Sequence, residues 1–163
     1  EMEGTYPLPE AQRDRFMTRI TMGYPSRDSE LEMLERHGAH NPLDELHPVT
    51  HGERITELID VVGSVYVADV VKDYLVNIVA ATRSHDAVRL GASPRASLHL
   101  IRTARAKAAL AGRDYVIPDD VQAMAIPVLA HRLLPSTRAQ LDGISPVDIV
   151  SQILTSTPVP EQA

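Results

Sequence analysis

The sequence predicts a mainly α-helical fold: a small helical bundle preceded by the edge of an α/β domain. From residue 65 onward, apolar residues recur at helical spacing in four segments joined by brief extended stretches. Three of these segments begin with a proline at a helix start, as Ser93-Pro94, Ser145-Pro146 and Pro118-Asp119 show. Residues 1–35 instead combine helical patterns with one strand-like pattern, which favours a piece of an α/β domain.

The first 36 residues predict two helices and one strand. Pro9 can open a short helix over residues 10–16. Residues 18–22 alternate polar and apolar side chains and include β-branched Thr and Ile, which predicts a short strand before Gly23. Ser26 is expected to cap a helix that reaches Arg36, with acidic residues in its first turns. Because one isolated strand is unstable, this region is expected to belong to a larger sheet.

The next segments lead to the bundle. Residues 37–52 form a loop rich in His and Pro, followed by a predicted helix over 52–62. Residues 65–67 are expected to be extended, and a long helix is predicted over 69–82.

The central element is a helix predicted over residues 94–111. Ser93 is a good N-cap, Pro94 fits the first helical position, and Gly112 ends the pattern. Its apolar side carries Leu100, Ala104 and Ala108, whereas Arg95, His99 and Arg102 fall on the opposite side.

Arg95 lies in the first turn of this helix. Unpaired backbone N–H groups and the helix dipole favour an anion there. The alternative is that Arg95 is an ordinary solvated arginine on an amphipathic helix, and the pattern alone favours that alternative.

Four more elements and a tail complete the chain. Residues 115–117 are expected to be extended, and a helix should follow over 118–129. Residues 132–134 are predicted as a short edge strand, and 145–154 as the last helix. The tail beyond Thr155 is expected to fray.

Composition limits the class of protein. The 163 residues include no cysteine, which excludes disulfides and cysteine-based metal sites and suits a cytoplasmic location. No apolar run is long enough for a transmembrane segment. One Phe, five Tyr and no Trp argue against nucleic-acid binding through stacked aromatic rings. The chain begins with Glu rather than Met, so it is expected to start inside a longer protein.

Charge is unevenly distributed. The chain has a net charge of −6, yet residues 83–113 contain seven basic residues and a single acidic one, Asp86. This local excess predicts an anionic partner, for which nucleotide phosphates, nucleic acid and an acidic protein surface are all candidates.

The histidine-rich loop could be read as a metal site, since His37, His40, His47 and His51 lie close in sequence. The loop has no cysteine, contains two prolines and lacks a regular spacing, so we interpret it as a polar connector and expect no metal site. The sequence also lacks the GxxxxGK[ST] loop that cradles a triphosphate, and it offers no recognisable nucleophile–base pair. A complete active site is therefore not expected.

Several ordered motifs resemble one family. They are residues 4–12, Asp14-Arg15-Phe16, Gly23-Tyr24-Pro25, His47-Pro48-Val49, Ala81-Thr82-Arg83, residues 91–96, residues 112–116, residues 118–121 and His131-Arg132-Leu133. Through these motifs, which span roughly residues 1–134, the chain resembles the C-terminal part of MoxR-type AAA+ ATPases, relatives of the magnesium-chelatase ATPase subunit.

This resemblance implies a division of the chain. Its fold would be an AAA+ lid domain following a remnant of the nucleotide-binding core, whose phosphate loop, Walker B acids and sensor 1 would lie upstream. The implied segments are a core edge over 1–35, a connector over 36–64, the helical lid over 65–157 and a tail over 158–163.

The resemblance also implies roles for two arginines. Arg15 matches the arginine finger, which acts on ATP bound to a neighbouring subunit, and Arg95 matches sensor 2, which contacts the γ-phosphate of its own subunit's ATP. Arginine suits both roles because it stays charged and binds phosphate bidentately. ATP and Mg²⁺ would be the cofactors, both held mainly by the upstream core.

The function implied is that of a hexameric, chaperone-like ATPase that remodels or assembles partner proteins, among them proteins with von Willebrand A-type domains. The fragment alone is then expected to be inactive. The alternatives are a stand-alone helical adaptor that binds an acidic protein surface, and a helix-turn-helix DNA-binding protein. The acidic net charge and few aromatics argue against DNA binding.

Overall fold

The computed structural model describes residues 8–36 and 42–160, and it confirms the mainly helical fold. The chain divides into two compact units. The first contains residues 1–19 and 60–163, and the second contains Ile20–Ile59. The candidate site lies wholly in the first unit, so that unit is described in more detail.

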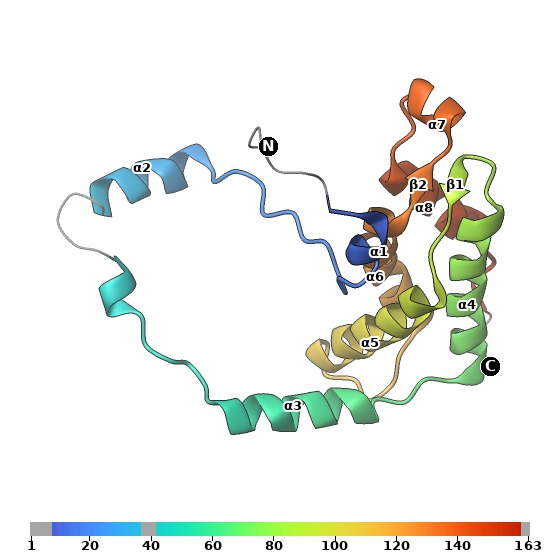
Figure 1. Cartoon of the computed structure of the whole chain (residues 1–163). Coiled ribbons are helices and arrows are strands. Elements are labelled where there is room, and N and C mark those ends of the chain that lie inside the picture. The colour runs from blue at the N-terminus through green and yellow to red at the C-terminus, as the bar shows by residue number, and fades with distance from the viewer. Residues whose placement is uncertain (1–7, 37–41, 161–163) are drawn as a thin grey trace. The chain divides into compact units, whose positions relative to one another are not determined.

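The first unit is a bundle of helices (Figure 1). Its elements among the described residues are α1 (Glu10–Arg13), the end of α3 (Gly52–Ser64), α4 (Asp69–Ser84), β1 (Val88–Leu90), α5 (Pro94–Leu110), α6 (Pro118–Leu129), the 3₁₀-helix η2 (Ala130–Arg132), β2 (Leu134–Pro135), α7 (Thr137–Leu141) and α8 (Pro146–Ser156). The four main helices, α4, α5, α6 and α8, follow the predicted ranges closely, because each begins at a local start signal and keeps its helical apolar spacing.

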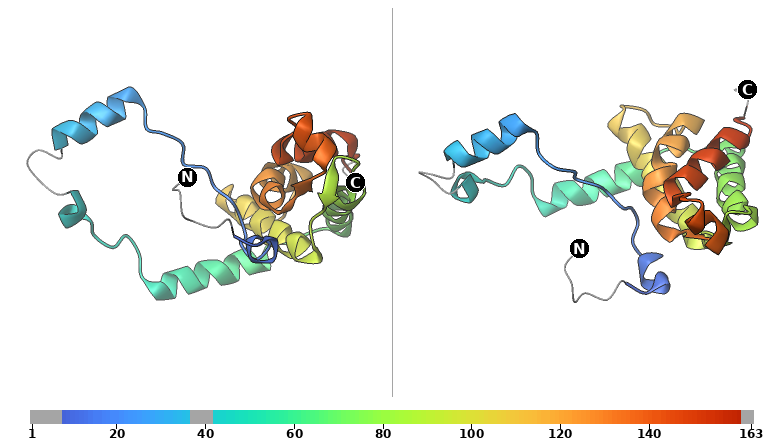
Figure 2. Two further views of the ribbon diagram at one scale, coloured as in Figure 1. Left: turned by 45° about the horizontal axis from the view of Figure 1, so that its top comes forward. Right: turned by 90° about the horizontal axis from the view of Figure 1, so that it is seen from above.

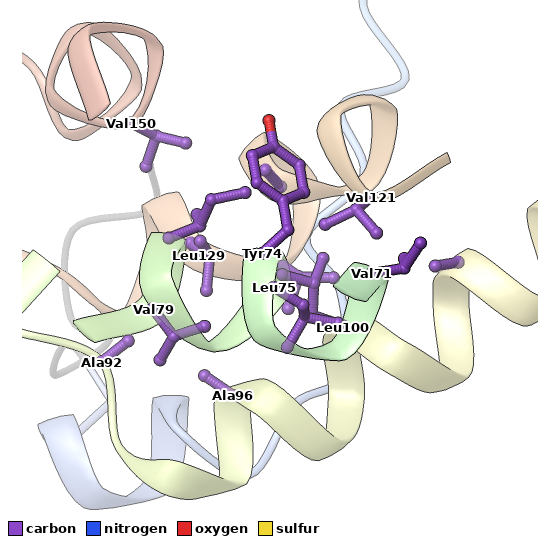
Figure 3. Close-up of a cluster of buried hydrophobic side chains, with 14 of the residues drawn as sticks. Val71, Tyr74, Leu75, Val79, Ala92, Ala96, Leu100, Val121, Leu129 and Val150 are labelled. Atoms are coloured by element: carbon purple, nitrogen blue, oxygen red, sulfur yellow. The ribbon is translucent and has the colours of Figure 1, made fainter. Parts of the chain in front are cut away.

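The hydrophobic core lies between these four helices. α5 packs against α6 and α4, and α8 lies beside both α4 and α6 (Figure 2). Figure 3 shows Leu75 of α4, Leu100 of α5 and Leu129 of α6 meeting in this core. Ala96, Ala104 and Ala108 are completely buried on α5, and such small side chains let neighbouring helices approach closely. The core therefore fixes the long axis of α5 and the direction of its first turn.

A two-stranded sheet closes one side of the bundle. β1 pairs with β2 in antiparallel register, with Val88 opposite Pro135 and Leu90 opposite Leu134. The edge strand predicted over 132–134 is wrong in its position, since Arg132 belongs to η2 and the strand begins at Leu134. Neither β1 nor α7 was predicted, because both are short and depend on tertiary contacts more than on local pattern.

The strand predicted over residues 18–22, which was expected to need a larger sheet, does not form within the described chain. These residues form no ladder, and the described part of the chain contains no strand that pairs with them. The Arg19 N–H instead donates to the Pro127 carbonyl at 2.9 Å. The alternating pattern alone cannot supply the backbone partners that a strand requires. The preceding helix α1 is shorter than expected, since it ends at Arg13 rather than near Phe16.

The second unit contains α2 (Arg27–Arg36), the 3₁₀-helix η1 (Pro42–Glu45) and most of α3. Ser26 accepts the Ser29 N–H at 3.2 Å, the capping bond expected of it. Neither α2 nor α3 has a buried residue. Ion pairs one turn apart, Glu32–Arg36 and Arg54–Glu57, lie on their exposed surfaces.

Candidate functional site

The start of α5 is held by the end of α4. A Cβ atom on Gly91 would lie 2.6 Å from the Thr82 carbonyl oxygen, so the backbone approach requires glycine. The Ala92 N–H donates to the Thr82 hydroxyl at 3.0 Å, and Arg83 Nε donates to the Ala92 carbonyl at 2.8 Å. The last turn of α4 therefore fixes the chain just before α5.

Ser93 and Arg95, at the first turn of α5, both contact the Asp14 carboxylate. Ser93 occupies the N-cap position as predicted, but its side chain makes no capping bond. Its hydroxyl instead lies 2.9 and 3.0 Å from the two carboxylate oxygens of Asp14, to which it donates. Arg95 Nη1 lies 3.4 Å from Asp14 Oδ2, and 49% of the Arg95 side chain is exposed. The first turn of α5 thus already holds one anionic group.

Arg132 contacts the same Asp14 carboxylate from the other side, so that Asp14, Ser93, Arg95 and Arg132 form one cluster. Its side chain is 1% exposed, and its Nε lies 3.3 Å from Asp14 Oδ1. The guanidinium also donates to the main-chain carbonyls of Asp14 at 3.3 Å, Phe16 at 2.5 Å and Met17 at 3.4 Å, and to that of Val128. Burial lowers the pKa of Arg132, and the adjacent Asp14 carboxylate opposes that shift.

Two histidines flank the Arg132 guanidinium. Arg132 Nη2 lies 2.5 Å from His99 Nδ1, and Arg132 Nη1 lies 3.0 Å from His131 Nε2. Burial lowers the pKa of His99, and the positive charges of Arg132 and Arg102 lower it further. Burial is also the main cause that lowers the pKa of His131. Both imidazoles are therefore neutral near pH 7 and can accept hydrogen bonds from arginine.

The structure places the two predicted site residues differently. Arg95 lies within the Asp14 cluster, whereas the Arg15 side chain is exposed. Within the described part of the chain, the Arg15 side chain has no hydrogen bond or ion pair. His99, expected on the solvated side of α5 with Arg95, is half-buried and faces Arg132.

Sequence reasoning missed the roles of Asp14, Ser93 and Arg132. Asp14 and Arg132 both lie in motifs that carry the family resemblance, but no role was assigned to them. Arg132 also stands in a largely apolar stretch, residues 124–134, and a lone arginine in such a stretch is a signal of a buried, paired guanidinium.

Several of the basic residues between positions 83 and 113 make contacts within the chain. Arg83 binds the Ala92 carbonyl, Arg89 lies 3.8 Å from Glu10, and Arg113 donates to both carboxylate oxygens of Asp120 at 2.7 and 2.6 Å. Arg102 and Lys107 are exposed. The excess is therefore spread over several local contacts, and the cluster at Arg95 is one of them.

The site residues suit a phosphate group better than a metal ion. A half-exposed arginine in the first turn of a helix fits an anion such as a phosphate group. No group of three or more His, Asp or Glu gathers anywhere in the described ranges, so these residues do not fit Mg²⁺ by themselves. His47 and His51 are exposed, and His37 and His40 lie outside the described residues. No helix in the described ranges is long and apolar enough to cross a membrane.

Comparison with known sequences identifies the bundle. Residues 80–153 match the family model described as an AAA lid domain. The chain is 45% identical to the protein YeaC of Bacillus subtilis, covering 99% of this chain and 51% of that protein. It is 40% identical to the chaperone MoxR1 of Mycobacterium tuberculosis, covering 99% and 45% respectively. The chain thus spans about half the length of these relatives.

Comparison with solved structures agrees. A crystal structure of a "putative ATPase" from Cytophaga hutchinsonii superposes with a TM-score of 0.90 at 34% identity, covering 99% of this chain and 52% of that one. The motifs, the helical bundle and these comparisons together show that residues 80–153 match an AAA lid domain and that the chain is similar, over nearly its whole length, to about half of MoxR-type AAA+ proteins.

Proposed function

We propose that this chain is the lid-bearing part of an ATPase that couples ATP binding and hydrolysis to the remodelling or assembly of partner proteins. The observation that carries the proposal is the placement of Arg95. Its guanidinium is half-exposed in the first turn of α5, where the core and the end of α4 fix the backbone and an anionic group is already accommodated.

Arg95 would act as sensor 2 on the nucleotide of its own subunit. Asp14 holds Arg95 through a single long contact of 3.4 Å, and a γ-phosphate offers more acceptor oxygens and more negative charge. Because ADP lacks the γ-phosphate, a contact between Arg95 and that group ties the orientation of the lid to the nucleotide state. The same contact would stabilise charge in the phosphoryl-transfer transition state.

Arg15 would act as an arginine finger on ATP bound to the neighbouring subunit of a homo-hexamer. Its exposed side chain and its place in the Asp14-Arg15-Phe16 motif support this proposal. Mg²⁺ and the triphosphate would be held mainly by residues upstream of this chain, and for that reason the chain alone should not hydrolyse ATP. Proteins with von Willebrand A-type domains are the proposed clients, in a cytoplasmic setting.

Matched substitutions in the full-length protein test the role of Arg95. Arg95→Ala should weaken the discrimination between ATP and ADP and slow hydrolysis, whereas Arg102→Ala, on the exposed surface of the same helix, should do much less. Nucleotide affinities and turnover would be measured for both variants. Equal and small effects would reduce Arg95 to a solvated surface arginine.

A mixing experiment tests the role of Arg15. Arg15→Ala should abolish hydrolysis and leave ATP binding largely intact, since removal of an arginine finger costs about 10³–10⁵-fold in turnover. Subunits with an intact Arg15 but a disabled phosphate loop should restore activity when mixed with Arg15→Ala subunits. Absence of any restoration would contradict action in trans.

A further inference from the structure

The contacts of Arg132 are directed mainly at one short stretch of main chain. Three carbonyls, those of Asp14, Phe16 and Met17, accept hydrogen bonds from its guanidinium. The Asp14 carboxylate adds an ion pair. The helix before this stretch, α1, has four residues and buries none of them. Hydrophobic burial therefore does not hold the stretch in place, and the polar contacts to Arg132 must do so.

These contacts surround Arg15 without using its side chain. The carbonyls bound by Arg132 belong to the residues directly before and directly after Arg15 and to the next residue along. The Arg19 N–H is also bound to the Pro127 carbonyl at 2.9 Å. The backbone around Arg15 is thus fixed to the bundle, while the Arg15 guanidinium stays exposed.

The same cluster reaches Arg95. The Asp14 carboxylate contacts Arg132 on one side and Ser93 and Arg95 on the other. Neutral imidazoles at His99 and His131 leave the Arg132 charge to be balanced by Asp14. A single carboxylate therefore joins the stretch that carries Arg15 to the first turn of the helix that carries Arg95.

We propose that Arg132 is a positioning residue for Arg15, and that Asp14 connects the Arg15 stretch to the first turn of the helix that carries Arg95. The functional half of this proposal rests on the proposed role of Arg15 as an arginine finger. A finger must reach a phosphate at a defined place, and a misplacement of about 1 Å can cost about a hundredfold in rate. Arg132, from inside the bundle, fixes the position of the backbone that carries Arg15.

Arginine is required for this role because of its shape. A planar guanidinium with five N–H donors can bind several carbonyls and a carboxylate together, whereas a lysine ammonium is a compact charge with three donors. Arg132→Lys in the full-length protein therefore keeps the charge but loses most of the bonds to residues 14–17. Arg113→Lys is the matched control, since it weakens the two-pronged bond to Asp120 near the other end of α5.

The first measurement is hydrogen–deuterium exchange, which needs no activity. In Arg132→Lys, the backbone amides of residues 14–19 should exchange at least about tenfold faster than in the parent protein, while Arg113→Lys leaves them unchanged. Asp14→Asn, which keeps the size of the side chain, should give a smaller increase in the same amides. Unchanged exchange of residues 14–19 in folded Arg132→Lys, as judged by its circular dichroism, would overturn the proposal.

The second measurement is ATP turnover in mixed assemblies. Arg132→Lys should lower kcat by about tenfold to a hundredfold with little change in KM. Mixing with subunits that have a disabled phosphate loop and an intact Arg132 should restore activity, as it does for a finger acting in trans. Faster exchange combined with normal turnover, or a defect that mixing does not restore, would overturn the positioning role.

These two measurements separate the two proposals. If Arg15→Ala hydrolyses ATP normally, the proposed role of Arg15 as a finger fails, and turnover then contains no information about its positioning. The exchange of residues 14–19 still decides whether Arg132 holds the stretch.

Discussion

The two ends of α5 are held in different ways. At the C-terminal end, Gly112 adopts a φ of 73° and Arg113 donates to both carboxylate oxygens of Asp120, seven residues further along. At the N-terminal end, Ser93 and Arg95 contact Asp14, which lies 79 and 81 residues away in sequence, and Asp14 in turn contacts Arg132. One end is closed by neighbours in sequence, and the other joins three distant parts of the chain.

The contacts at one end of α5 stabilise the fold, whereas those at the other end position residues outside the core. Burial alone would raise the pKa of Asp120, but hydrogen bonds from Arg113 and from the Ile117 N–H outweigh it, and the pKa is lowered. That pair stabilises a turn and the start of α6. The cluster around Asp14 instead decides where residues outside the core are held. Loss of the Arg113–Asp120 pair should only lower the free energy of unfolding. Loss of the cluster around Asp14 should also release residues 14–19 from the bundle.

The largest effect is expected from Arg132→Met in the 163-residue chain. The substitution keeps an unbranched, largely apolar stem but removes the guanidinium, which leaves Asp14 and the carbonyls of Phe16 and Met17 without their buried donor. Breaking a buried ion pair from one side costs about 3–5 kcal/mol. Urea unfolding followed by circular dichroism measures the cost. A loss below about 1 kcal/mol would mean that the two ends of α5 do not differ as described.

The next largest effect is expected from Gly91→Ala. The added Cβ would meet the backbone of Thr82 and Arg83 at 2.6 to 2.8 Å, and backbone cannot rotate away as a side chain can. Overpacking of this kind costs about 1–3 kcal/mol. The same denaturation experiment applies, with Gly52→Ala as the control, because a Cβ there meets no atom within 4 Å. Equal stability of the two variants would contradict the close approach of the chain at Gly91.

A smaller effect is expected from Asp120→Asn at the other end of α5. The asparagine keeps one acceptor oxygen but loses the charge that binds Arg113, which should cost about 1–2 kcal/mol. The comparison is sharpened by hydrogen–deuterium exchange of the same variant. Exchange of residues 14–19 should stay unchanged, and faster exchange there would show that the two ends are coupled.

The smallest effect is expected in the pH dependence of stability. Because burial and nearby arginines lower the pKa of His99 in the folded chain, the unfolded chain binds a proton more readily as pH falls below about 6.5. Stability should therefore rise with pH between about pH 5 and 6.5. His99→Gln should flatten this slope, and His51→Gln, at an exposed position, should not. Urea midpoints measured across this range provide the test, and an unchanged slope in His99→Gln would contradict the assigned shift.

The elements that the sequence predicts well are those with local signals. α5 begins at Pro94 and ends at Leu110, one residue short of the predicted end, because Pro94 and Gly112 mark its limits and its apolar side is regular. The ranges of α4, α6 and α8 are also close to the predicted ones, for the same reason. Arg95 was placed in the first turn of a helix from local pattern alone, and the structure agrees with that placement.

The features that sequence reasoning missed depend on distant contacts. The strand predicted over residues 18–22 does not form, because its alternating pattern has no described partner strand. The contact between Asp14 and Arg132 joins residues 118 apart, and no local pattern indicates which arginine would be buried against which carboxylate. The proposed roles of Arg15 and Arg95 depend on a bound nucleotide and a neighbouring subunit, which no pattern within this chain describes.

The separation of Asp14 from Arg132 has a consequence for biosynthesis. Ribosomes add about 5–20 residues per second, so roughly 6–24 s pass between the synthesis of residue 14 and that of its partner 118 residues later. During this interval the contacts with Arg132 cannot form, because η2 has not yet been made. The stretch can dock only after η2 has emerged, which makes its attachment one of the last steps in the maturation of the newly made chain.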